Sequence, residues 1–313
     1  MSTALDASPG ETVDAAMIPP VPAFAAAPVR PFYWSVRREL WENRSITIAP
    51  LVAAAIVMLG FLASAGGLPN KMRAVLALDV AQQGPTLAMP YGIAAMVVLV
   101  TSVLVAVFYC LDALHGERRD RSILFWKSLP VSDRTAVLAK ASIPLVVLPL
   151  LAFVTVVAVQ VAMLLLSTLV LNVAGVGATA LWTQMPLVGT TLAMFYGLVA
   201  FALWYAPVYA WLLLVSAWAR RTMFLWALLP PLAIVIVEKL SFGTGHFASL
   251  LQYRLTGVFA QAFTARQQHA VMAPLAQLDP EKFFGSPGLW AGLVAAAAFL
   301  AAAVWLRRNR EPI

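Results

Sequence analysis

Residues 112–140 read DALHGERRDRSILFWKSLPVSDRTAVLAK and lie between two long apolar runs. The stretch holds six of the chain's 21 Lys and Arg residues, more than any other connection between apolar runs. Cytoplasmic connections of membrane proteins carry an excess of Lys and Arg. We therefore predict that Asp112–Lys140 is a cytoplasmic loop.

The loop has an internal pattern. A charged block, Glu117–Arg121, precedes an apolar block, Ile123–Trp126. Leu129-Pro130 then interrupts any helix. Ser132 with Asp133 can cap a new helix that leads into the next apolar run. Four large apolar side chains on the water side of a membrane need a surface to pack on, and a soluble partner would supply one.

Two parts of this loop resemble a known family. Residues 117–124, ERRDRSIL, and 128–132, SLPVS, are similar to the first cytoplasmic loop of ABC-2 type permeases. The family pattern is roughly E-R-E-x-G-T-L, followed shortly by S/T-x-P, a hydrophobic residue and Ser. Glu117 and Arg118 match its opening and Pro130 its close, whereas Arg-Ser replaces the usual Gly-Thr.

The resemblance implies a function as well as a fold. It implies an all-α membrane protein, the permease subunit of an ATP-driven exporter, with six transmembrane helices and an N-terminal interfacial helix. Its partners would be a separate ABC ATPase subunit, which binds the ATP and Mg, and a second permease subunit. Export as the direction of transport follows from the resemblance alone. The residues expected to couple to the ATPase are Glu117, Arg118, Arg119, Asp120, Ile123, Leu124, Phe125, Trp126 and Pro130.

Composition agrees with a membrane protein. Hydrophobic residues make up 62% of the chain and charged residues 11%, against about 25% charged residues in a soluble domain. The net charge of +7 could indicate nucleic acid, but the basic residues flank apolar runs and are better explained as topology signals beside membrane lipid. We therefore expect no nucleic-acid partner.

Six apolar runs are long enough to cross a bilayer, which needs about 20 residues. The predicted spans are Ile46–Ala65, Tyr91–Leu111, Ala141–Leu169, Val188–Ala217, Met223–Leu240 and Gly288–Leu306. With this layout, 15 of the 21 Lys and Arg residues fall on the side of Asp112–Lys140. We predict a multi-pass protein of the inner (cytoplasmic) membrane with both termini in the cytoplasm.

The segments outside the spans divide the chain further. Residues 1–30 are rich in Ala and Pro and predict a disordered cytoplasmic tail before a membrane domain of residues 31–308, and 309–313 form a second tail. Residues 31–45 predict a helix in the membrane interface, or else an extension of the first span. Its proposed interfacial residues are Trp34, Arg37, Arg38 and Trp41. The connection 241–287 is too apolar for a free loop and predicts either re-entrant helices or a small external helical cap.

Motifs for catalysis are missing from the sequence. It contains no G-x-x-x-x-G-K-[ST], no H-E-x-x-H, no G-x-S-x-G and a single Cys. We therefore predict a transport subunit that is not an enzyme, has no ATPase site and binds no metal or cofactor itself. Candidate pathway residues are Gln160, Tyr196 and Tyr205, although an interhelical hydrogen bond explains Gln160 and packing explains the two Tyr residues equally well.

Two other function classes compete with the permease prediction. An ion- or proton-coupled secondary transporter is the main alternative, but ionisable residues are nearly absent from the centres of the spans and no internal repeat is visible. An intramembrane enzyme is the third, and the missing motifs disfavour it. A neighbouring reading frame for an ABC ATPase would favour the permease.

Overall fold

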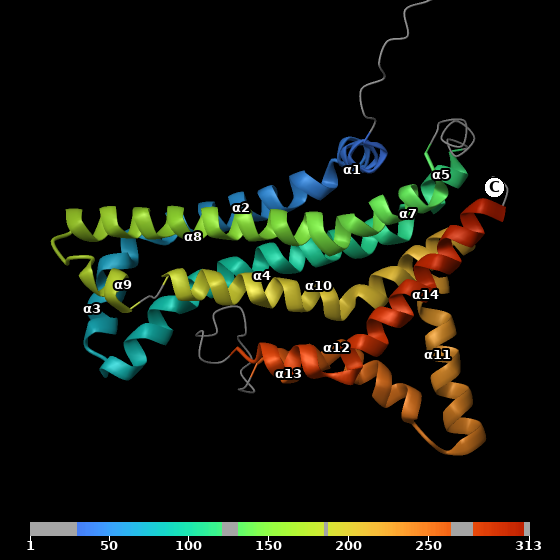
Figure 1. The fold of residues 1–313 in the computed structure, drawn as a ribbon. Coiled ribbons are helices and arrows are strands. Elements are labelled where there is room, and N and C mark those ends of the chain that lie inside the picture. Colours follow the sequence, from blue (N-terminus) through green and yellow to red (C-terminus); the bar gives the residue numbers. More distant parts are fainter. Residues whose placement is uncertain (1–29, 121–130, 185–186, 264–277, 310–313) are drawn as a thin grey trace, which may run out of the picture. The chain divides into compact units, whose positions relative to one another are not determined.

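The computed structural model of the chain describes residues 30–120, 131–184, 187–263 and 278–309 (Figure 1). Contacts between residues divide the chain into two units, Met1–Arg30 and Pro31–Ile313, and every helix given below belongs to the second unit. All regular elements in the described residues are helices, and no strand occurs among them. The all-α prediction is confirmed for this part of the chain.

Six helices in the described residues are long and apolar enough to cross a membrane. They are α2 (Ser45–Ser64), α4 (Val80–Asp112), α8 (Leu148–Val173), α10 (Leu187–Trp218), α11 (Met223–Phe242) and α14 (Pro287–Asn309). The six predicted apolar segments are therefore confirmed as six candidate spans. Helix α4 begins at Val80 rather than at Tyr91, because apolar composition marks the part that fits the bilayer core while backbone hydrogen bonds continue into polar flanks.

Shorter elements connect these helices. They are α1 (Pro31–Glu42), the 3₁₀-turn η2 (Ala65–Gly67), α3 (Leu68–Leu76), α5 (His115–Arg119), α7 (Asp133–Ser142), the π-turn η3 (Ile143–Val147), α9 (Thr179–Gln184), α12 (His246–Ala262) and α13 (Pro280–Gly285). Helix α7 starts where predicted, because the Ser132 hydroxyl accepts a hydrogen bond from the Thr135 N–H at 3.1 Å. It then runs through η3 into α8, so the loop is continuous with the third span.

Helix α10 packs against α14, α4, α12 and α8. One apolar cluster joins α2, α4 and α8 through side chains such as Val98 and Leu164. A second joins α4, η3 and α10, and it includes Ile143, Leu213 and the buried Cys110. Helix α11 differs from the others, because Ala227 is its one buried residue.

Several proline residues lie inside helices or turns of the membrane domain. Pro144 falls in the π-turn η3, where the Leu148 N–H donates to the Ile143 carbonyl, five residues earlier. Pro207 lies inside α10, and Pro230 with Pro231 lies inside α11. Proline cannot donate to the helical ladder, so a π-turn beside Pro144 is a natural way to adjust the backbone.

The apolar connection between α11 and α14 is covered in part by α10. The indole N–H of Trp204 donates to the Arg254 carbonyl at 2.8 Å, and the Tyr205 hydroxyl donates to the Leu255 carbonyl at 2.6 Å. Both bonds hold α12 against α10. Both predicted placements of this segment, re-entrant and external, allow these contacts. Residues 264–277 lie outside the described residues.

Candidate functional site

Helix α1 has two chemically different faces. Trp34 and Trp41 are 53% and 64% exposed, and the Arg37 guanidinium lies over both rings, at 5.2 and 4.6 Å from their centroids. Glu39 points to the other side and is 1% exposed. An interfacial helix is expected to turn its polar face to water, but here that face packs on α7 of the same chain.

The Glu39 carboxylate accepts three hydrogen bonds, each 2.8 Å long. The donors are the Lys140 ammonium, the Arg38 guanidinium and the Tyr109 hydroxyl. Lys140 comes from α7 and is 2% exposed. The buried charge of α1 is therefore neutralised by a cation at the base of the third span.

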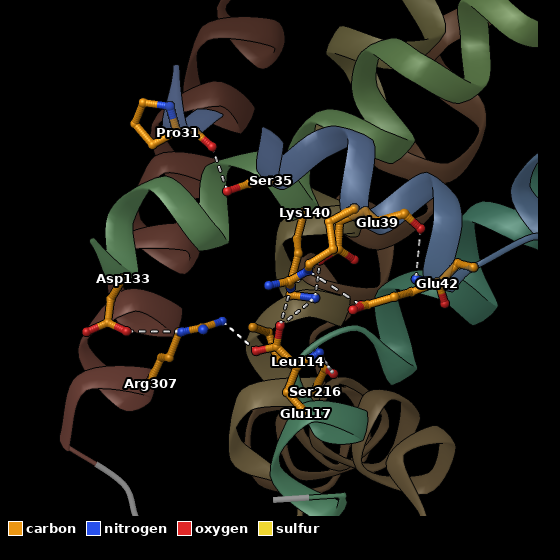
Figure 2. A network of polar contacts seen from close by, with 12 residues as sticks. Pro31, Ser35, Glu39, Glu42, Leu114, Glu117, Asp133, Lys140, Ser216 and Arg307 are labelled. Atoms are coloured by element: carbon orange, nitrogen blue, oxygen red, sulfur yellow. Dashed lines mark hydrogen bonds and ion pairs between the residues drawn. The ribbon is translucent and has the colours of Figure 1, made fainter. Parts of the chain in front are cut away.

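Glu117 in α5 brings a second carboxylate to the same place. It accepts from Arg38 at 2.7 Å and from Arg307 of α14 at 2.7 Å, and it lies 3.1 Å from the Lys140 ammonium. Arg307 also donates to Asp133 of α7 at 3.0 Å. Figure 2 shows Lys140 and Arg307 pointing toward Glu117, and Asp133 beside Arg307. We call this group the ionic cluster, defined by Arg38, Glu39, Glu117, Asp133, Lys140 and Arg307.

The ionic cluster balances its own charge, with three carboxylates and three cations. Desolvation of a buried ion costs several kcal/mol, roughly, and is offset when each charge has close partners. The pKa of Arg38 shows this balance: burial alone would lower it, but the carboxylates of Glu39, Glu117 and Glu42 more than offset burial and raise it. The guanidinium therefore stays charged inside the protein.

A separate set of hydrogen bonds joins α5 to the end of α10. The Ser216 hydroxyl accepts from the Leu114 and His115 N–H groups at 3.0 and 2.9 Å. Arg118 donates in return to the Ala217 carbonyl at 2.7 Å. The first N–H groups and last C=O groups of a helix lack partners within it, so each of these helices supplies the partners that the other needs.

The structure separates the predicted coupling residues into three groups. Glu117 and Arg118 are buried, at 7% and 4% exposed, and their role in coupling stays a prediction. Burial is possible because both find partners within the chain. Arg119 and Asp120 are exposed and pair with each other at 3.0 Å. The remaining ones lie outside the described residues, namely Ile123, Leu124, Phe125, Trp126 and Pro130.

The candidate pathway residues do not form one site. Gln160 is buried in α8, with its amide nitrogen 3.5 Å from the Tyr91 carbonyl of α4, at the long end of the hydrogen-bond range. Tyr196 and Tyr205 instead donate to carbonyls of α12, at 3.3 and 2.6 Å. The contacts of all three fit the alternative of links between helices.

Most of the ionic cluster was not predicted as a site. Lys140 and Arg307 are predicted only as topology signals, Arg38 is predicted as an interfacial residue, and Glu39 is not among the predicted site residues. The sequence carries no local signal for Lys140 and Arg307, because a basic residue beside an apolar run is usually a topology signal whose long side chain snorkels to the headgroups.

The described residues hold no group of three or more His, Cys, Asp or Glu side chains that could bind a metal. Comparison of the chain with protein-family models, curated proteins and solved structures found no match.

Proposed function

We propose that this chain is the membrane-spanning subunit of an ATP-driven ABC-2 type exporter that works with a separate ATPase. The observation that carries the proposal is the ionic cluster, because it fastens both ends of the loop around residues 121–130 to the spanning helices. The resemblance of that loop to the ABC-2 coupling segment supplies the class of partner.

The connections of the loop suit the transmission of force. Helix α5 follows α4 after two residues, and α7 continues through η3 into α8. Glu117 and Lys140 pair across the loop, and Arg307 joins them to α14. A displacement applied to the loop by an ATPase would therefore move α4, α8 and α14 together, and the bonds at Ser216 would carry it to α10.

This mechanism assigns the chemistry to the partner. The ATPase would bind ATP and Mg and perform hydrolysis, while this chain and a second permease subunit would form the path for the substrate. Alternating access then follows from closing and opening of the ATPases beneath the loop. The direction, export, comes from the family resemblance.

The arrangement of charges favours this function over a proton-coupled carrier. Such carriers place ionisable side chains along the route through the membrane. Here the buried carboxylates of Glu39 and Glu117 gather with cations, at 2.7–3.1 Å, next to the ends of helices. That geometry suits a link between elements better than a site that binds and releases protons.

Purification of the tagged chain from its native membranes tests the proposal. We expect an ATPase with a Walker motif to co-purify in amounts comparable to the chain, and Mg-dependent ATP hydrolysis in the preparation. A preparation of folded chain without any such ATPase, whose transport responds to a proton gradient instead, would contradict the proposal and favour the alternative.

A further inference from the structure

An apolar cavity of about 480 Å³ lies where α4, the η3–α8 segment, α10 and α12 meet. Its size falls in the range of about 300–1,000 Å³ that is usual for small-molecule sites. No charged side chain lines it. Side chains from all four elements form its walls, among them Leu99, Val103, Leu148, Phe201, Tyr209 and Phe259.

The cavity lies beside a π-turn and several proline residues of the spanning helices. Pro144 of the π-turn and Pro149 at the start of α8 both line it. Pro207 lies inside the continuous helix α10 between Tyr205 and Tyr209, and both of these Tyr residues line the cavity. Prolines and π-turns perturb the regular helical ladder and are frequent at functional sites.

The polar groups of the cavity wall are three hydroxyls. The Ser102 hydroxyl donates to the Val98 carbonyl at 2.8 Å, and that of Tyr205 donates to the Leu255 carbonyl at 2.6 Å. The Tyr209 hydroxyl makes no hydrogen bond within the described residues. It is therefore free to form a hydrogen bond with a polar group of a ligand inside the cavity.

We propose that this cavity binds an uncharged, mainly apolar molecule that carries one hydrogen-bonding group. The apolar walls hold its body, and the Tyr209 hydroxyl binds its polar group. The absence of charged residues from the walls excludes a charged ligand, because a buried charge needs a partner. Binding needs no ATPase, so the inference stands apart from the proposed function. A ligand that is also the cargo would define the substrate class of the transporter.

Photolabelling of the purified full chain in phosphatidylcholine nanodiscs tests the proposal. The probe is hexadecanol with a diazirine in its chain, and mass spectrometry locates the adducts. We expect adducts concentrated on the peptides that contain Val103 and Tyr209, and loss of this labelling, roughly tenfold, in Ala202→Phe, which fills the cavity. Val199→Phe is the matched control, because Val199 lies on the same helix but is exposed and does not line the cavity.

Tyr209→Phe tests the polar contact. Loss of one hydrogen bond should weaken binding of the alcohol probe roughly three- to tenfold, while a diazirine alkane of equal length should bind this variant and the parent chain equally. Equal binding of the alcohol to both proteins would overturn the assignment of Tyr209.

Competition identifies the source of the ligand. Displacement of the probe by unlabelled hexadecanol and not by added phosphatidylethanolamine indicates a free small molecule, whereas displacement by the phospholipid indicates a lipid acyl chain, and both outcomes support the site. The dependence of labelling on probe concentration is measured on the parent chain alone and should reach a plateau. This test therefore holds even if Ala202→Phe does not fold. Labelling that does not saturate and follows the exposed faces of α2 and α11 would overturn the proposal.

Discussion

Glu117 contacts three cations at once, Arg38, Lys140 and Arg307. Removing its charge leaves an excess of positive charge in a buried place, and breaking a buried ion pair costs about 3–5 kcal/mol. We expect Glu117→Gln to lower the Tm of the detergent-purified chain strongly. Thermal unfolding followed by fluorescence is the measurement.

The matched control for this change lies three residues away. Asp120→Asn also removes a carboxylate charge from the same connection, but the Asp120 side chain is exposed, and exposed ion pairs contribute little. The Tm of this variant should equal that of the parent chain. Equal Tm values for both variants would show that the ionic cluster does not stabilise the fold.

At this scale the sequence allowed only part of the site to be predicted. The charge of Glu117 is a local fact of the sequence, whereas its place in a family motif stays a prediction. Its partner Arg307 lies 190 residues away and the pair of Glu39 and Lys140 spans 101 residues. Such pairs depend on how α1 and α14 lie against α7. The periodicity of apolar residues within one segment does not show which helices pack together, so these pairs could not be predicted.

One hydroxyl of α10, that of Ser216, accepts hydrogen bonds from two N–H groups at the start of α5. Ser216→Ala removes the acceptor for Leu114 and His115, and the loss of a helix cap costs about 1–2 kcal/mol. We expect the amides of both residues to exchange hydrogen faster, as followed by mass spectrometry. Ser249→Ala, which removes an exposed hydroxyl that bonds within its own helix, is the control. Unchanged exchange at α5 would refute this link.

Helix α1 leaves its aromatic face uncovered by the described residues, as an interfacial helix would. We predict that Trp34→Glu combined with Trp41→Glu reduces the amount of folded protein in membranes, because two charges then face the lipid headgroup boundary. Deletion of residues 2–28 should have little effect. The yield of monodisperse protein on size-exclusion chromatography measures both, and equal losses from the two changes would refute the assignment.

The spanning helices were the most predictable elements. Their apolar length fixes them without any knowledge of neighbours, which explains why each predicted span lies inside one of the six long helical segments, although several of these segments extend further. Shorter elements such as α3, α9 and α12 depend on packing. Helix α12 is held by bonds from Trp204 and Tyr205 on α10, so its place could not be deduced from its own residues.

At the scale of the whole molecule, we predict that the ionic cluster lies on the cytoplasmic side of the membrane. Most Lys and Arg residues lie on the same side as the cluster, and such an excess marks the cytoplasmic side. Two single-cysteine chains test this after Cys110→Ala, namely Asp120→Cys and His246→Cys, since both side chains are exposed. An impermeant maleimide should label position 246 from outside intact cells and position 120 only after lysis. The reverse labelling would invert the topology and contradict the coupling function.

The central claim is that Asp112–Lys140 couples the spanning helices to an ATPase. Its most direct test compares Tm and ATPase co-purification in one preparation of Phe125→Ala combined with Trp126→Ala, two positions outside the described residues. Buried aromatic anchors of an interface contribute about 2 kcal/mol or more each, so affinity for the ATPase should fall roughly thirtyfold or more. We predict an unchanged Tm with loss of the ATPase, whereas a normally folded variant that retains its ATPase at full strength would contradict the claim.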